Sequence, residues 1–165
     1  MRVAVRADVA FQNSGGLRAD LAEGVVTRGG IYEVMPFENT IVTMELTGAE
    51  VKRVIEDGLR GGRVHQVSGL RFAFDSRRPA MDRVTALQAG DGTPFDTTRT
   101  WTVAVNNFMA DGGDDSSTLA RGRNKRDTQV LVRDALERFV RERCAGGGAL
   151  DYKTEGRITR AGGGD

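Results

Sequence analysis

Short segments with alternating apolar and polar positions recur along the chain, and this pattern predicts β-strands. Residues 70–75 (LRFAFD) place Leu70, Phe72 and Phe74 on one face, as a half-buried strand requires. Residues 40–46 (TIVTMEL) alternate less regularly but are rich in β-branched side chains. Further strands are predicted at residues 7–12, 83–89, 101–106 and 155–160.

Helices are predicted where apolar positions recur three or four residues apart. Residues 47–50 (TGAE) match a capping box, in which the threonine and glutamate side chains each bind a backbone N–H group. The helix that follows has one apolar face and is expected to end near residues 61–62. A short helix is predicted at residues 27–34, with Thr27 as its N-cap. The strongest helical pattern covers residues 127–143.

Strands and helices alternate irregularly, without the βαβ rhythm of a doubly wound sheet. The sequence shows no internal repeat and no linker, and its 165 residues are the size of one ordinary domain. We therefore predict a single α+β domain with a mixed sheet over residues 1–160, followed by a flexible glycine-rich tail at residues 161–165.

Composition narrows the classes of protein to consider. The formal net charge of +1 argues against a dedicated nucleic-acid binder, and the basic run at residues 121–126 is expected to be a solvated loop. No stretch of about 18 apolar residues is present, so no membrane span is expected. Cys144 is predicted to be an unpaired bystander thiol. The N-terminus has no signal-peptide pattern, and its abrupt start suggests a piece of a longer protein.

The chain lacks the residues that autonomous hydrolysis usually needs. It contains one histidine and one cysteine, whereas a structural zinc site uses about four such ligands and a dinuclear site uses several. His65 has no nucleophile elbow near it and is expected in a surface loop. We therefore predict that the chain binds no metal or other cofactor and contributes no catalytic residue.

A first candidate binding segment is Asn-Ser-Gly-Gly-Leu-Arg, which directly follows a predicted strand. Gly15 and Gly16 allow the backbone to approach a ligand closely. Asn13 suits a sugar hydroxyl, and the planar guanidinium of Arg18 suits phosphate oxygens. The same residues are equally compatible with an ordinary glycine-rich turn that carries a surface arginine.

Two further segments place an aromatic residue in a connection. In residues 36–40 (PFENT), Phe37 is either a stacking platform for a base or a core plug under a loop. Residues 106–114 (NNFMADGGD) combine Phe108 with amides, glycines and carboxylates. A base stacked on an aromatic face gains about 1–3 kcal/mol, and a carboxylate accepts hydrogen bonds from ribose hydroxyls. The alternative for residues 106–114 is a calcium-like or plain acidic turn.

The order of five segments is more specific than any one of them. These segments are NSGGLRAD, YEVMPFENT, ELTGAEV, VSGLRFAFD and NNFMADGGD. Together they resemble the C-terminal domain of the 5'-nucleotidase family, which includes UDP-sugar hydrolases and 2',3'-cyclic phosphodiesterases. The resemblance covers residues 7–114 strongly and the remainder more loosely.

The resemblance implies a division of labour between two domains. An N-terminal metallophosphoesterase domain, absent from this chain, would hold two divalent metal ions and perform hydrolysis, while the C-terminal domain clamps the substrate. Phe37 and Phe108 match the two phenylalanines that sandwich the base in the family, and Asn39 matches the asparagine at the base edge. Asp114 matches the aspartate that binds ribose hydroxyls, next to Gly112 and Gly113.

The resemblance also maps Asn13 and Arg18 onto a family asparagine and arginine, with Arg18 on phosphate. One departure from the family pattern lies at Asp115, where glycine followed by an aromatic residue is usual. An aspartate there adds negative charge and restricts the backbone. Further phosphate-binding arginines of the family lie upstream of this chain, so the chain should hold phosphate poorly.

These features predict the nucleotide-recognition domain of a metal-dependent phosphohydrolase that acts in nucleotide catabolism, inactive without its linked N-terminal domain. The partner would be a nucleotide or a nucleoside-containing small molecule, and AMP, UDP-sugars, cyclic nucleotides and dinucleotides stay open. The resemblance suggests a periplasmic, cell-envelope or extracellular location. The alternative is a stand-alone binding or scaffold domain that has kept the fold and lost nucleotide recognition.

Overall fold

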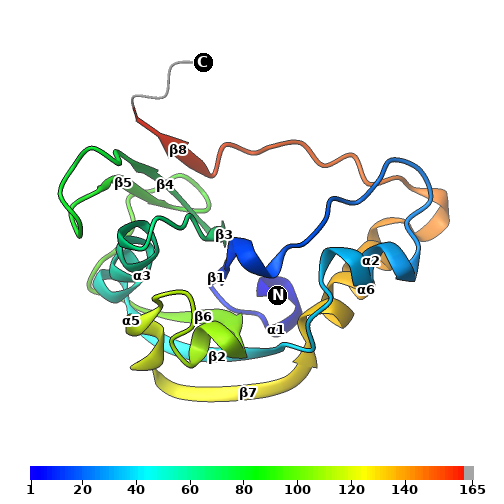
Figure 1. Ribbon diagram of the computed structural model, residues 1–165, viewed down its shortest axis with the longest axis horizontal. Coiled ribbons are helices and arrows are strands. Elements are labelled where there is room, and N and C mark those ends of the chain that lie inside the picture. Colours follow the sequence, from blue (N-terminus) through cyan, green and yellow to red (C-terminus); the bar gives the residue numbers. More distant parts are fainter. Residues whose placement is uncertain (162–165) are drawn as a thin grey trace.

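The strands of the computed structural model, which describes residues 1–161, form two mixed sheets (Figure 1). The larger sheet has five strands in the order β3-β1-β6-β2-β7, and the smaller has three in the order β5-β4-β8. Strands β1 and β6 are parallel, as are β4 and β8, and the other neighbours are antiparallel. The strands are β1 (Val9–Gln12), β2 (Thr40–Thr47), β3 (Gln66–Ser68), β4 (Leu70–Phe74), β5 (Val84–Ala89), β6 (Thr100–Asn106), β7 (Arg123–Leu131) and β8 (Ile158–Arg160).

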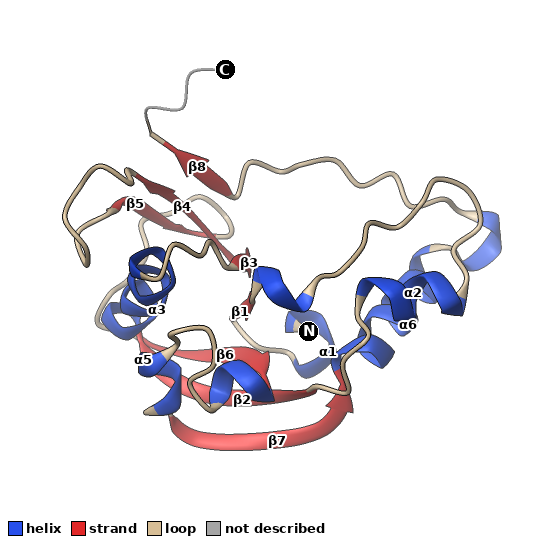
Figure 2. Ribbon diagram, in the orientation of Figure 1, coloured by secondary structure: helices blue, strands red, loops and turns tan. Residues whose placement is uncertain are grey.

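Helix α3 (Gly48–Arg60) lies between the two sheets (Figure 2). It contributes to the main core, which contains residues of both sheets. Its predicted capping box is present, because Thr47 Oγ1 accepts from the Glu50 backbone N–H at 3.3 Å and the Glu50 carboxylate accepts from the Thr47 backbone N–H at 2.7 Å. The predicted apolar face is buried with Phe11, Phe72 and Phe74, and comprises Val51, Val54, Ile55 and Leu59.

The five-stranded sheet is covered on both faces. Along β2, Val42, Met44 and Leu46 belong to the main core, whereas Ile41 belongs to a second core cluster. The same alternation separates the residues of β1 and β6, as the pleat of a strand requires. The second cluster is closed by α1 (Arg2–Val5), α2 (Arg28–Val34) and α6 (Val132–Arg143), and α2 lies beside α6 (Figure 1).

Most of the expected elements are confirmed, including α2 with Thr27 as its N-cap, but the long helix is wrong in its first part. Residues 127–131 form the end of β7, and α6 begins only at Val132. Asp127 accepts a hydrogen bond from Thr40 at 2.9 Å, and Thr128 donates to the Ile41 carbonyl at 2.8 Å. Pairing with β2 thus overrides the local helical pattern.

The expected loop at residues 121–126 is wrong, because β7 begins at Arg123, but the expected solvent exposure is confirmed for all of these residues except Gly122, which is half-buried. Arg123 forms a bidentate contact with the Glu50 carboxylate, with both distances 3.0 Å. Short elements that the sequence analysis did not predict are the helices α1, α4 (Asn107–Ala110) and α5 (Ser117–Ala120) and the strand β3. Of the predicted tail, residues 162–165 lie outside the described residues.

The expectation of a surface loop for His65 is contradicted, since this side chain is only 3% exposed. Its imidazole packs against Gly58 of α3, where an added Cβ would lie 2.8 Å from Nε2. Neither ring nitrogen has a hydrogen-bond partner among residues 1–161. A neutral imidazole tolerates this environment far better than a charged one.

We predict that His65 makes the folded state less stable in mild acid. Burial lowers the pKa of His65 below 6.5, Arg63 adds to this effect, and Asp114 and Asp57 oppose it. The unfolded chain therefore takes up a proton first as the pH falls below about 6.5, and the free energy of unfolding decreases by up to about 1.4 kcal/mol per pH unit. Urea denaturation between about pH 7 and pH 5 should show a shallower decrease for His65→Phe than for the wild type. An identical pH dependence would contradict this assignment.

Candidate functional site

The end of β6 fixes the orientation of Phe108. Asn106 is fully buried, and its side-chain oxygen accepts from the Met109 backbone N–H at 2.8 Å, which caps α4. Met109 and Ala110 point into the core. Because α4 is only one turn long and its Met109 side faces the core, Phe108 points away from the core, and its side chain is 46% exposed.

The ring of Phe108 lies against the backbone of Gly113. A Cβ added to Gly113 would stand 2.5 Å from Cε1 and 2.6 Å from Cε2 of the ring. The Gly113 backbone N–H also donates to the Phe108 carbonyl at 2.9 Å. Any larger residue at position 113 would therefore displace the aromatic ring, which explains why this position is glycine.

A buried amide network connects β1 with β6 at their carboxyl ends. Asn13 is 5% exposed, and its side-chain oxygen accepts from Asn106 at 2.8 Å and from Gln12 at 3.0 Å. Its amide nitrogen donates to Asp114 Oδ2 at 2.7 Å. Because the two strands are parallel, the loops that follow them meet at one edge of the sheet. The structure thus brings together two predicted site residues that are 101 positions apart.

Asp114 lies at the centre of this edge. Its side chain is partly exposed, and Arg63 Nε approaches its Oδ1 at 3.3 Å. Gly15 borders the same carboxylate, since an added Cβ would lie 3.7 Å from Asp114 Oδ2. Asp114 and Gly112 both have a positive φ, of 54° and 97°, so the loop is tightly turned. The arrangement presents a fixed carboxylate beside an exposed aromatic ring.

The remaining predicted residues lie on the adjoining segments. Phe37 is 46% exposed in the connection between α2 and β2, so it is not a core plug. Asn39 is partly buried, and its carbonyl accepts from the Val132 N–H at 2.8 Å. Arg18 is tied by its backbone N–H to the Val34 carbonyl at 2.9 Å. Its guanidinium has no carboxylate partner within residues 1–161 and reaches only the Gly15 carbonyl at 3.4 Å.

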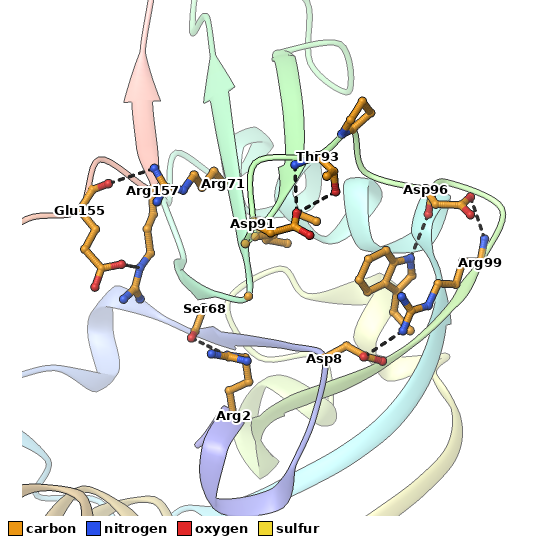
Figure 3. Close-up of a pocket in the computed structure, with 16 residues that line it drawn as sticks. Arg2, Asp8, Ser68, Arg71, Asp91, Thr93, Asp96, Arg99, Glu155 and Arg157 are labelled. Atoms are coloured by element: carbon orange, nitrogen blue, oxygen red, sulfur yellow. Dashed lines mark hydrogen bonds and ion pairs between the residues drawn. The ribbon is translucent and has the colours of Figure 1, made fainter.

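A cleft of about 520 Å³ opens elsewhere, at the junction of the two sheets (Figure 3). Its walls carry charges of both signs, and several are already satisfied, as in the Arg99–Asp8 pair at 3.0 Å and the Arg157–Glu155 pair at 2.9 Å. Sequence reasoning missed this cleft because its lining comes from well-separated segments with no shared motif. Its balanced charges do not favour a particular ligand.

Two features of the described part of the chain bear on the predicted chemistry. Within residues 1–161, no three His, Cys, Asp or Glu side chains gather in a way that could hold a metal ion. None of the helices described is both long enough and apolar enough to cross a membrane.

Known proteins resemble this chain in both sequence and fold. Residues 1–121 match the family described as 5'-nucleotidase, C-terminal domain. The trifunctional nucleotide phosphoesterase protein YfkN of Bacillus subtilis is 33% identical over 94% of this chain and 11% of its own length. The cell wall protein Lmo0130 of Listeria monocytogenes is 27% identical over 91% of this chain and 20% of its own length. The 5'-nucleotidase precursor from Thermus thermophilus has a TM-score of 0.88 and 36% identity, over 99% of this chain and 33% of that one.

The chain therefore belongs to the 5'-nucleotidase C-terminal domain family, as the five ordered segments predicted. Its mixed α+β fold is the fold of that domain, which confirms the predicted fold class. The chain spans only between 11% and 33% of the length of these relatives. Relatives with these lengths are consistent with a linked further domain, and they include a cell wall protein.

We predict that Gly113→Ala displaces the Phe108 ring without unfolding the domain. The added Cβ meets the far end of a flexible, exposed side chain, so the free energy of unfolding should change by less than about 1 kcal/mol. Thermal denaturation measures the stability, and nuclear Overhauser contacts between the ring and residue 113 report the ring position. Gly29→Ala is the matched control, because its Cβ would have only ordinary contact with Thr27. An unmoved ring in Gly113→Ala would refute the proposed packing.

Proposed function

We propose that this domain recognises the nucleoside part of a nucleotide within a 5'-nucleotidase-type phosphohydrolase. The observation that carries the proposal is the Asp114 carboxylate, held at 2.7 Å by the buried Asn13 amide at the sheet edge that also presents Phe108. A carboxylate fixed next to an exposed aromatic face suits a ribose attached to a base.

The two exposed phenylalanines have the chemistry of a base sandwich. Phe37 and Phe108 would each stack on one face of the base, and Asn39 would meet its polar edge. Stacking contributes about 1–3 kcal/mol per aromatic contact and tolerates any base, so it supports a clamp of broad base specificity. Both side chains are almost half exposed without ligand, and burying them would add hydrophobic stabilisation.

The polar residues would bind the sugar and phosphate. Asp114 would accept hydrogen bonds from the ribose hydroxyls, and the buried Asn13 would take part in ribose binding by holding this carboxylate in place. Arg18, which lacks a carboxylate partner within residues 1–161, would meet a phosphate oxygen. The glycines at this edge would let the backbone approach the ligand, and they are Gly15, Gly16, Gly112 and Gly113.

Hydrolysis would take place on another domain. We propose that residues 1–160 are the C-terminal domain of a longer protein, covalently linked to an N-terminal metallophosphoesterase domain with two divalent metal ions. Metal ions at such a site activate water and stabilise the developing charge. The domain described here would hold the substrate in position for that reaction. This lowers the activation barrier, because the reacting groups are already oriented when the reaction begins. A cell wall protein among the relatives supports an envelope or extracellular location.

We predict that Phe37→Ala combined with Phe108→Ala abolishes measurable nucleoside binding. Calorimetric titration of the chain with adenosine, AMP and UDP-glucose should give weak saturable binding, which the double variant weakens by more than about tenfold. Tyr152→Ala is the control, because Tyr152 is an exposed aromatic residue that contacts Phe139 rather than the site. Unchanged affinity in the double variant would make the stacking assignment wrong. Absence of binding in the wild type would favour a scaffold domain that has lost nucleotide recognition.

We also predict that the purified chain releases no phosphate from AMP. The reason is that the proposed metal centre lies on another domain, so added Mn²⁺ or Mg²⁺ should not restore activity. A colorimetric phosphate assay with and without a chelator measures this. Chelator-insensitive turnover that co-purifies with the chain would instead indicate an autonomous enzyme.

A further inference from the structure

Arg63 bridges two neighbouring carboxylates at the candidate site. It lies between the end of α3 and the start of β3. Its Nε stands 3.3 Å from Asp114 Oδ1, and its Nη1 stands 2.7 Å from Asp115 Oδ2. Nη1 also reaches the Gly61 carbonyl at 3.5 Å. A planar guanidinium can make these contacts simultaneously because its donors form a rigid fork.

The bridge offsets the repulsion between the Asp115 carboxylate and its neighbour Asp114. Asp114 and Asp115 are consecutive, both have a left-handed backbone with φ of 54° and 62°, and two like charges side by side repel. An uncompensated pair would also repel an anionic nucleotide. Arg63 supplies one positive charge between the two carboxylates and holds Asp115 beside the end of α3.

Gly61 makes room for the bridge. A Cβ added to Gly61 would lie 3.2 Å from both Arg63 Nη1 and the carboxyl carbon of Asp115. The ion pair therefore lies close against the backbone at the end of α3. Such a contact limits the positions that the Asp115 carboxylate can take.

The bridge and the Asn13 amide together determine the orientation of Asp114. One carboxylate oxygen accepts from Asn13 at 2.7 Å, and the other faces Arg63. Each carboxylate oxygen can accept two hydrogen bonds, so each keeps one acceptor site for a ligand. Two acceptor sites on one fixed carboxylate match two adjacent hydroxyl groups on a sugar ring.

We propose that Arg63 is a positioning residue that sets the selectivity of this site for nucleosides with free 2'- and 3'-hydroxyl groups. It does so in two ways, by fixing the Asp114 carboxylate and by neutralising Asp115. This inference rests on the nucleoside site proposed above and adds the residue that makes the sugar selectivity possible. Loss of Arg63 should leave base stacking intact.

The test compares the affinities of this chain for adenosine and 2',3'-dideoxyadenosine, measured by calorimetry. In the wild type, adenosine should bind about tenfold more tightly, because hydrogen bonds to a charged acceptor are the stronger kind. In Arg63→Met, adenosine binding should weaken by about tenfold, while dideoxyadenosine binding changes by less than about twofold. The ratio of the two dissociation constants should therefore approach one.

Two further variants separate a positioning role from a merely structural one. Arg60→Met is the matched control, because Arg60 is an exposed arginine three residues away that ends α3. Its ratio of dissociation constants should equal that of the wild type. Adding Asp115→Gly to Arg63→Met removes the uncompensated Asp115 charge but leaves Asp114 held by Asn13 alone. Arg63→Met should bind AMP more weakly than the wild type because Asp115 then repels the phosphate, and the double variant should regain this AMP affinity without regaining the preference for adenosine over dideoxyadenosine.

The outcomes distinguish this inference from the function on which it rests. A wild-type ratio retained in Arg63→Met, with binding still lost in the Phe37 and Phe108 double variant, would overturn the role of Arg63 and leave the nucleoside site standing. A wild-type chain that binds neither nucleoside would overturn the proposed function and this inference together. Equal weakening of both ligands in Arg63→Met would mean a general structural role and would also overturn the selectivity assignment.

Discussion

The parallel pairing of β1 with β6 is the constraint on which the candidate site depends. It brings the loops after both strands to one edge of the sheet, where the side chains of Asn13, Asn106 and Asp114 form a continuous hydrogen-bonded chain. The register is enforced from both faces, because alternate residues of each strand belong to different core clusters. A slip by one residue would exchange those faces and also break the contact between Asn13 and Asn106.

Burial gives this network its rigidity. Asn13 and Asn106 are almost completely excluded from solvent, so each polar group needs a partner, and the two amides satisfy each other and Asp114. In such surroundings the hydrogen bonds are stronger than in water and a lost partner is costly. The Asp114 carboxylate is thereby oriented before any ligand arrives, and a preorganised acceptor avoids part of the ordering cost of binding.

Sequence reasoning succeeded where the signal is local and failed where it is not. The capping box at Thr47, the N-cap at Thr27 and the alternation of β4 depend on neighbouring residues, and all three are present. Residues 127–131 were misassigned because pairing with the distant strand β2 decides their conformation. His65 was misplaced because the space it fills is made by Gly58 of α3. The candidate site residues were proposed from the resemblance of the ordered segments and stay a prediction, whereas their contacts and the bridge made by Arg63 appear only in the folded structure.

The charges at the candidate site argue that ligand recognition does not depend on long-range electrostatic attraction between the site and an anionic ligand. Arg63 contacts both Asp114 and Asp115, whereas Arg18 has no carboxylate partner within residues 1–161, and these four side chains together carry two positive and two negative formal charges. A neutral site gains little from long-range attraction to a phosphate, and its affinity would have to come from stacking and directed hydrogen bonds. Strong phosphate binding would then fall to whatever lies opposite this edge in a longer protein. Under the proposed function, a domain that directs its contacts to the nucleoside rather than to the phosphate suits a substrate whose phosphate must engage a second, positively charged centre.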